Sequence, residues 1–165
     1  MESAVLIALA LVALTFLFHF KVLVWLGRIT PLIGTQSQYG VLLIVLVLFF
    51  AHICEIGFYA AAYAVSVINL KLGSFEGGDI TGAMAYFYYS GVIYTSLGLG
   101  DIHPHGHIRF ITAIEALNGL LLIAWSASFT FMVMGKVWVV APPKESNTIY
   151  QKEDLGGKHD ETKRD

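Results

Sequence analysis

The chain has 165 residues, of which 56% are apolar and only 13% are charged, and its net charge at pH 7 is −2. A typical soluble domain carries about 25% charged residues, so this composition argues against a soluble enzyme. The slight negative charge argues against a nucleic-acid-binding protein, and the single cysteine, Cys54, argues against a disulfide-stabilised secreted domain. Half of the charged side chains lie in residues 141–165. The rest of the chain therefore has the composition of a membrane protein.

Three apolar runs have the length of membrane-spanning helices. Residues 3–20 and 116–135 contain no Asp, Glu, Lys or Arg, and residues 39–70 contain only Glu55. A helix needs about 20 mostly apolar residues to cross the hydrocarbon core of a bilayer. The first run differs from a signal peptide because no basic residue precedes it. We therefore predict three transmembrane helices, the first of them retained.

The distribution of basic residues predicts the orientation of these helices. Lys21 and Arg28 flank the short segment between the first two runs, and basic residues concentrate on the cytoplasmic side of membrane proteins. The N-terminus is then outside and the second helix runs outward. The third helix returns inward to Lys136 and to residues 141–165, which we expect to form a polar cytoplasmic tail.

A short helix is predicted between the second and third spans. Residues 81–95 are rich in aromatic side chains, and Asp79 or Thr81 could cap the N-terminus of the helix. A helix of this length cannot cross a bilayer, so we expect a core helix or a re-entrant one.

The short helix is followed by residues 96–101, in which Gly98 and Gly100 alternate with leucines. Glycine adopts backbone angles that other residues avoid, so successive carbonyls in such a segment can point the same way. Irregular backbone at membrane depth survives where it lines a water-filled path, and a ring of carbonyls can replace the hydration shell of a cation. Two alternatives are a simple loop and a nucleotide-binding fingerprint. The fingerprint fails because His103 occupies the place of its third glycine.

Residues 86–104, YFYYSGVIYTSLGLGDIHP, resemble the pore helix and selectivity filter of potassium channels. The segment is similar in particular to small prokaryotic channel subunits and to two-pore-domain channels, which use a GLGD filter. The resemblance covers about residues 39–138 and continues through Pro104, Arg109 and Gly119, the last at the place of the hinge glycine.

The resemblance implies an all-α membrane protein in which three transmembrane helices and one re-entrant pore helix with its filter loop assemble as a tetramer around a central pore. Residues 1–38 would form the first helix and a cytoplasmic loop, and residues 39–140 the pore domain. That domain would consist of an outer helix, a pore helix, a filter and an inner helix at residues 39–70, 81–95, 96–101 and 108–138.

The same resemblance implies roles for individual residues. The filter would be Thr95, Ser96, Leu97, Gly98, Leu99, Gly100 and Asp101, with potassium bound by the carbonyls of Ser96, Leu97, Gly98 and Leu99. The supporting residues would be Tyr88, Tyr89, Tyr94 and Glu115, with Tyr88 placed to hydrogen-bond Asp101. The cavity and hinge would be formed by Asn118, Gly119, Ile123, Ala127 and Phe131. No other cofactor is implied.

The filter departs from the family's TVGYG at three positions. Ser96 replaces threonine but keeps a hydroxyl group, and Leu97 replaces valine. Leu99 replaces tyrosine and so loses a ring hydroxyl that in the family helps to hold the filter open. The carbonyls are unchanged, so the resemblance implies potassium selectivity that is weaker than usual.

Ionisable side chains inside an apolar span suggest function, because such residues are costly in a membrane. His52 and Glu55 lie three residues apart on one face of the second helix. They could contribute to a metal site, or they could hydrogen-bond each other or the third helix. Glu115 is expected to brace the filter through Tyr89, Tyr94 or backbone amides, with a helix–helix contact as the alternative.

Three histidines alternate in the segment after the filter: His103, His105 and His107. They could sense protons or bind a transition metal, because imidazoles change charge near neutral pH and are common metal ligands. Pro104 and Gly106 instead favour a simple solvated turn.

The function that we predict is passive conduction of potassium through a homotetrameric pore in the cell membrane, with no enzymatic activity. Four alternatives stay open: a non-selective or sodium-permeable channel, a heteromeric assembly, a non-conducting partner subunit, and a membrane metalloenzyme using His52, Glu55 and Glu115. The first helix carries no ladder of arginines, which argues against a voltage sensor.

Overall fold

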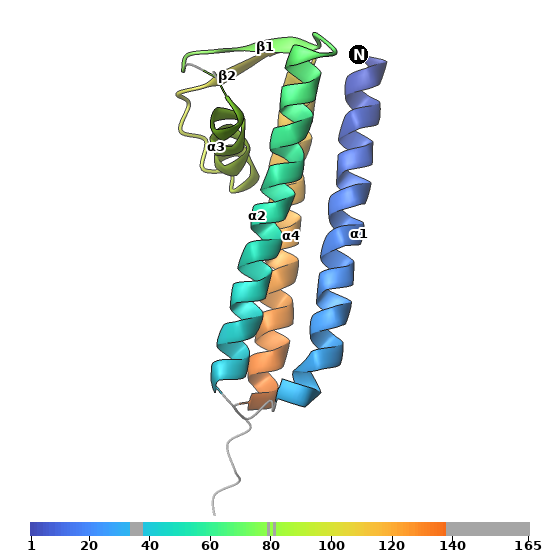
Figure 1. Ribbon diagram of the computed structural model, residues 1–165, viewed down its shortest axis with the longest axis vertical. Helices are drawn as coiled ribbons and strands as arrows, with labels where there is room; N and C mark the ends of the chain where they lie inside the picture. Colours follow the sequence, from blue (N-terminus) through green and yellow to red (C-terminus); the bar gives the residue numbers. More distant parts are fainter. Residues whose placement is uncertain (34–37, 79, 81, 138–165) are drawn as a thin grey trace, which may run out of the picture.

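Three long helices form the body of the molecule in a computed structural model that describes residues 1–33, 38–78, 80 and 82–137. These are α1 (Glu2–Ile33), α2 (Gln38–Ile68) and α4 (Ile108–Val137), and they run side by side (Figure 1). Each is long and apolar enough to cross a membrane. The prediction of three such helices is confirmed. The predicted tail, residues 141–165, lies outside the described residues.

The fourth helix is short. α3 (Ala83–Tyr94) has 12 residues and packs against α2 and α4 near one end of the bundle (Figure 1). At 1.5 Å per residue it is about 18 Å long, too short to cross a bilayer. It begins after Gly82 without a side-chain cap, and the predicted caps Asp79 and Thr81 lie outside the described residues.

A two-stranded antiparallel sheet joins the segments that flank α3. β1 (Gly73–Glu76) pairs with β2 (His103–Gly106), with Glu76 opposite His103 and Gly73 opposite Gly106. The prediction of a simple turn around His103 to His107 was therefore wrong. The backbone groups of β2 find hydrogen-bond partners in β1, a segment about thirty residues away, which local sequence signals could not show.

The bundle is apolar outside and partly polar inside. Large apolar side chains such as Leu17, Phe49 and Phe50 are exposed along the long helices. In contrast, nine polar or charged side chains among the described residues are buried: Thr15, His19, Thr30, Glu55, Ser66, Ser90, Glu115, Asn118 and Ser126. This pattern suits a lipid environment, in which polar groups must satisfy one another inside the protein.

Candidate functional site

The segment after α3 has a backbone in which left-handed residues alternate with ordinary ones. Ser96, Gly98 and Gly100 have φ angles of +57°, +58° and +73°, whereas Leu97 and Leu99 between them do not have positive φ. In a regular strand successive carbonyls point to opposite sides. A change of handedness at every second residue allows successive carbonyls to point to the same side.

The beginning of this segment is anchored to the end of α3. The backbone N–H groups of Ser96 and Leu97 donate hydrogen bonds to the carbonyls of Ile93 and Val92, at 2.8 and 3.0 Å. The left-handed conformation costs about 1–2 kcal/mol for a residue with a side chain, so Ser96 holds stored strain.

The far end of the segment is held by a side-chain hydrogen bond. The hydroxyl of Tyr88 on α3 donates to a carboxylate oxygen of Asp101 at 2.8 Å, as the sequence predicted. This hydrogen bond raises the pKa of Tyr88 above its ordinary value, because the bond stabilises the protonated phenol.

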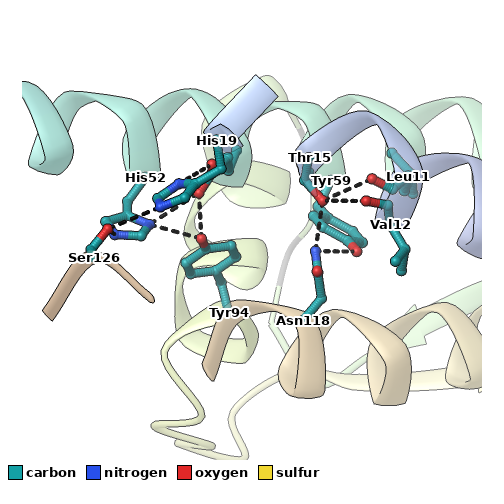
Figure 2. A network of polar contacts seen from close by, with 10 residues as sticks. Leu11, Val12, Thr15, His19, His52, Tyr59, Tyr94, Asn118 and Ser126 are labelled. Atoms are coloured by element: carbon teal, nitrogen blue, oxygen red, sulfur yellow. Dashed lines mark hydrogen bonds and ion pairs between the residues drawn. The ribbon is translucent and has the colours of Figure 1, made fainter. Parts of the chain in front are cut away.

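A buried polar network holds the last residue of α3 (Figure 2). The Tyr94 hydroxyl donates to Glu55 and lies 2.8 Å from Nδ1 of His52. His19 on α1 and Ser126 on α4 complete the network, and Figure 2 shows the labelled side chains of this network pointing toward one another. His52 and Glu55 therefore hydrogen-bond each other and α4, one of the two alternatives predicted. The sequence analysis missed His19, although a histidine inside an apolar run is itself a signal.

Ligand atoms of His19, His52 and Glu55 lie within 4.8 Å of one another. Each of these side chains also lies within hydrogen-bond distance of another, so the three residues take part in one hydrogen-bonded network. Glu115, the third residue of the predicted metalloenzyme set, does not belong to this group.

Glu115 braces α3 through a different residue from the ones predicted. Its carboxylate accepts hydrogen bonds from Tyr63 on α2 and Ser90 on α3. Tyr89 instead lies 3.0 Å from the hydroxyl of Thr112, and burial raises the pKa of its phenol to about 12. The prediction named the wrong residue because the rotation of α3 about its axis turns Ser90, rather than Tyr89, toward Glu115.

Asn118 does not face a cavity, so that prediction was wrong. Its side chain is 2% exposed and donates hydrogen bonds to Thr15 on α1 and Tyr59 on α2, at 2.8 and 2.9 Å (Figure 2). Helix α1 covers this face of α4. The other residues predicted to line the cavity, Ile123, Ala127 and Phe131, are exposed on α4.

At Gly119, α4 packs closely against the end of α3. A Cβ atom at this position would lie 2.1 Å from the backbone oxygen of Tyr94. The helix continues without interruption through residue 119. Gly119 is thus a close-packing position, and the hinge role stays a prediction.

The profile of an ion channel family matches residues 41–136, more than half of the chain. The chain belongs to this ion channel family. No curated protein and no solved structure matches the chain. The matched segment contains all of α3 and nearly all of α2 and α4, whereas α1 precedes it. Together with the three apolar helices, this establishes a membrane protein from a family of ion channels rather than of enzymes, and such channels generally assemble as oligomers.

In this ion channel subunit, Gly119→Ala should destabilise the packing of α3 on α4. The new methyl group meets backbone, which cannot rotate away, so we expect a loss of about 1–3 kcal/mol in the free energy of unfolding. Thermal unfolding in detergent measures the change. Gly135→Ala, on the same helix with nothing within 4 Å, is the matched control and should be neutral or slightly stabilising. Equal stability of the two variants would contradict this close contact.

Proposed function

We propose that the chain is the subunit of a potassium-selective channel and that residues 95–101 form its filter. The alternation of positive φ at Ser96, Gly98 and Gly100 is the observation that carries the proposal. The backbone carbonyls of Ser96, Leu97, Gly98 and Leu99, with the Ser96 hydroxyl, would replace the hydration shell of the ion. Gly100 and Asp101 would complete the outer end.

The position of α3 supports this proposal. The segment begins at the C-terminal end of a helix, where the helix dipole gives partial negative charge that favours a cation. A helix of 12 residues followed by irregular backbone would then be a re-entrant element, which enters the membrane and returns on the same side.

A single chain supplies only one row of carbonyls, so the working unit would be four chains around a central axis. Leu97 and Leu99 are 63% and 56% exposed in the single chain, and Leu97 borders an apolar groove between α2 and α3. Neighbouring subunits would cover these surfaces. A homotetramer is the simplest assembly, with other channel subunits as possible partners.

The orientation follows from the same arrangement. The N-terminus lies at the end of the bundle that carries β1 and β2 (Figure 1). If Asp101 faces the outside, as an outer ring of carboxylates should, the N-terminus is outside as well. The chain after α4 would then continue in the cytoplasm.

A non-selective cation channel is the second candidate, and Leu99 favours it. This side chain is apolar and more than half exposed in the single chain, so it offers no hydroxyl that could tie the filter to α3. Potassium flux into liposomes that contain the purified protein, with barium as blocker, tests for conduction. Reversal potentials in mixed potassium and sodium solutions distinguish the two candidates.

Gly98→Ala should reduce potassium flux at least tenfold without preventing membrane insertion. A Cβ atom at Gly98 would meet nothing within 4 Å, so the cost comes from the left-handed φ of +58°, about 1–2 kcal/mol in each chain. Gly27→Ala on α1, which also meets nothing within 4 Å, should conduct like the wild type. Wild-type flux through Gly98→Ala would exclude the proposed filter.

Leu99→Tyr should raise the permeability of potassium relative to sodium, or lengthen the open time. A phenol at this position can hydrogen-bond neighbouring groups and hold the filter against collapse. Leu99→Phe is the matched control, because it adds the ring without the hydroxyl. Identical permeability ratios and open times in the wild type and both variants would show that Leu99 does not limit selectivity.

Asp101→Asn should lower the single-channel current most at low potassium concentration. Four carboxylates around the mouth would concentrate cations, and salt screens this effect over about 8 Å at physiological ionic strength. Tyr88→Phe separates charge from structure, because it removes the hydrogen bond to Asp101 but keeps the carboxylate. It should leave the dependence of the current on potassium unchanged. A current in Asp101→Asn equal to the wild type at every potassium concentration would mean that Asp101 is not at the mouth.

A further inference from the structure

Four side chains inside the bundle form a closed ring of hydrogen bonds. The two carboxylate oxygens of Glu55 lie 2.8 Å from Nδ1 of His19 and 3.0 Å from Nδ1 of His52. The Ser126 hydroxyl lies 3.1 and 3.0 Å from the Nε2 atoms of the same two histidines. Both nitrogens of each imidazole are therefore engaged, and the ring contains four contacts.

Counting protons shows that this ring is one proton short. Each contact needs one proton between its two heavy atoms. A neutral histidine supplies one proton, the Ser126 hydroxyl supplies one, and an ionised carboxylate supplies none. With two neutral histidines and an ionised Glu55, three protons serve four contacts. The contacts to the ionised carboxylate are the stronger ones because they are charge-assisted, so the contact without a proton would lie between one Nε2 and the serine oxygen.

We propose that the ring of His19, Glu55, His52 and Ser126 is a binding site for one additional proton. That proton completes the fourth contact whether one histidine is an imidazolium or Glu55 is a neutral acid, because the two forms differ only in which atoms carry the protons around the ring. In both forms the ring is neutral overall. Without the proton it carries a net charge of −1.

The surroundings favour the neutral form. His19 and Glu55 are fully buried in the apolar bundle, where an unpaired charge is costly. The groups that face the ring are Tyr59 on α2, Tyr94 on α3, and Trp125 on α4, whose ring centroid is 5.8 Å from that of His19. None of these is positively charged. Glu115 on α4, which is also buried, accepts hydrogen bonds from Tyr63 and Ser90 and is not a member of the ring.

Tyr94 connects the proton site to the proposed filter, and this step rests on the proposed function. Its hydroxyl donates to Glu55 and lies beside His52, and the next residue, Thr95, begins the filter segment. Loss of the proton breaks one contact of the ring and leaves a charge beside Tyr94. Conduction should therefore decline as the pH rises through the value at which the ring releases its proton.

The proton site is tested without reference to conduction by ¹⁵N nuclear magnetic resonance of histidine in bilayers. The variant His103→Gln, His105→Gln, His107→Gln and His159→Gln leaves only the two ring histidines. At pH 7 we expect three protonated imidazole nitrogens in the pair, or two together with a neutral Glu55 carboxyl in the ¹³C spectrum, because each form contains the additional proton. Two protonated nitrogens beside an ionised Glu55 carboxylate would overturn the proposal. A change in the spectrum on adding a zinc chelator would identify bound metal instead and would also overturn it.

Ser126→Ala tests the ring itself. The protonated ring makes two contacts with this hydroxyl and the deprotonated ring only one, so the variant loses one hydrogen bond that favours the proton. The pH of proton release should fall by about one unit, a tenfold loss of proton affinity. Ser126→Thr keeps the hydroxyl and should restore it. Ser128→Ala on the same helix, whose exposed hydroxyl bonds only Ala124, is the matched control. An unchanged pH of release in Ser126→Ala would overturn the ring.

Glu55→Gln separates proton binding from its effect on the filter. An amide can donate to His19 and accept from His52 and Tyr94, which completes all four contacts without an extra proton. In the variant that lacks His103, His105, His107 and His159, potassium flux should decline at high pH. Adding Glu55→Gln to that variant should remove the decline. If both variants show the same pH profile, the coupling to conduction is wrong. If neither conducts, the proposed function fails, whereas the resonance experiment still decides the proton site.

Discussion

Tyr94 is held at both its backbone and its side chain, and the geometry of the proposed filter depends on this residue. Its carbonyl packs directly against Gly119 of α4, and its hydroxyl donates to Glu55 of α2. The left-handed Ser96 lies two residues further along the chain. A strained backbone conformation persists only where the surrounding structure holds it in place. The fixed C-terminal end of α3 holds Ser96 in this way.

The lipid environment of the helices explains why so many polar groups lie inside this bundle. In water, side chains such as Glu55 and Glu115 would be hydrated at little cost, but hydrocarbon offers no partners. The carboxylate of each acid is hydrogen-bonded to side chains of at least two other helices. Each acid therefore holds those helices together in addition to having its own oxygens hydrogen-bonded. Within the part of the chain that the structure describes, only Ser66 Oγ and Asn118 Oδ1 are buried side-chain atoms without a partner.

Helix α1 lies before the segment that matches the ion channel family, yet it is part of the same packed interior. Thr15 accepts a hydrogen bond from Asn118, and His19 closes the ring of polar contacts around Glu55. The helix therefore changes the environment of residues that belong to the channel domain. An asparagine that could otherwise face water on α4 is enclosed between helices instead.

The sequence by itself determined the membrane class, the three long helices, the short helix between them and the glycine segment that follows it. These features depend on composition, on the length of apolar runs and on the conformational freedom of glycine, all of which are local. The hydrogen bond from Tyr88 to Asp101 was also predicted, from the resemblance of residues 86–104 to the pore region of known channels.

Only the tertiary structure decided which distant residues meet. The pairing of β1 with β2, the hydrogen bond from Ser90 to Glu115 and the enclosure of Asn118 depend on how the helices rotate about their axes and which faces they present. His19 and Ser126 are 107 residues apart in the sequence, and they come into contact only because α1 and α4 pack together. Hydropathy indicates that a segment prefers lipid, but it does not indicate which side of the helix faces the interior. That rotation determines which polar side chains meet.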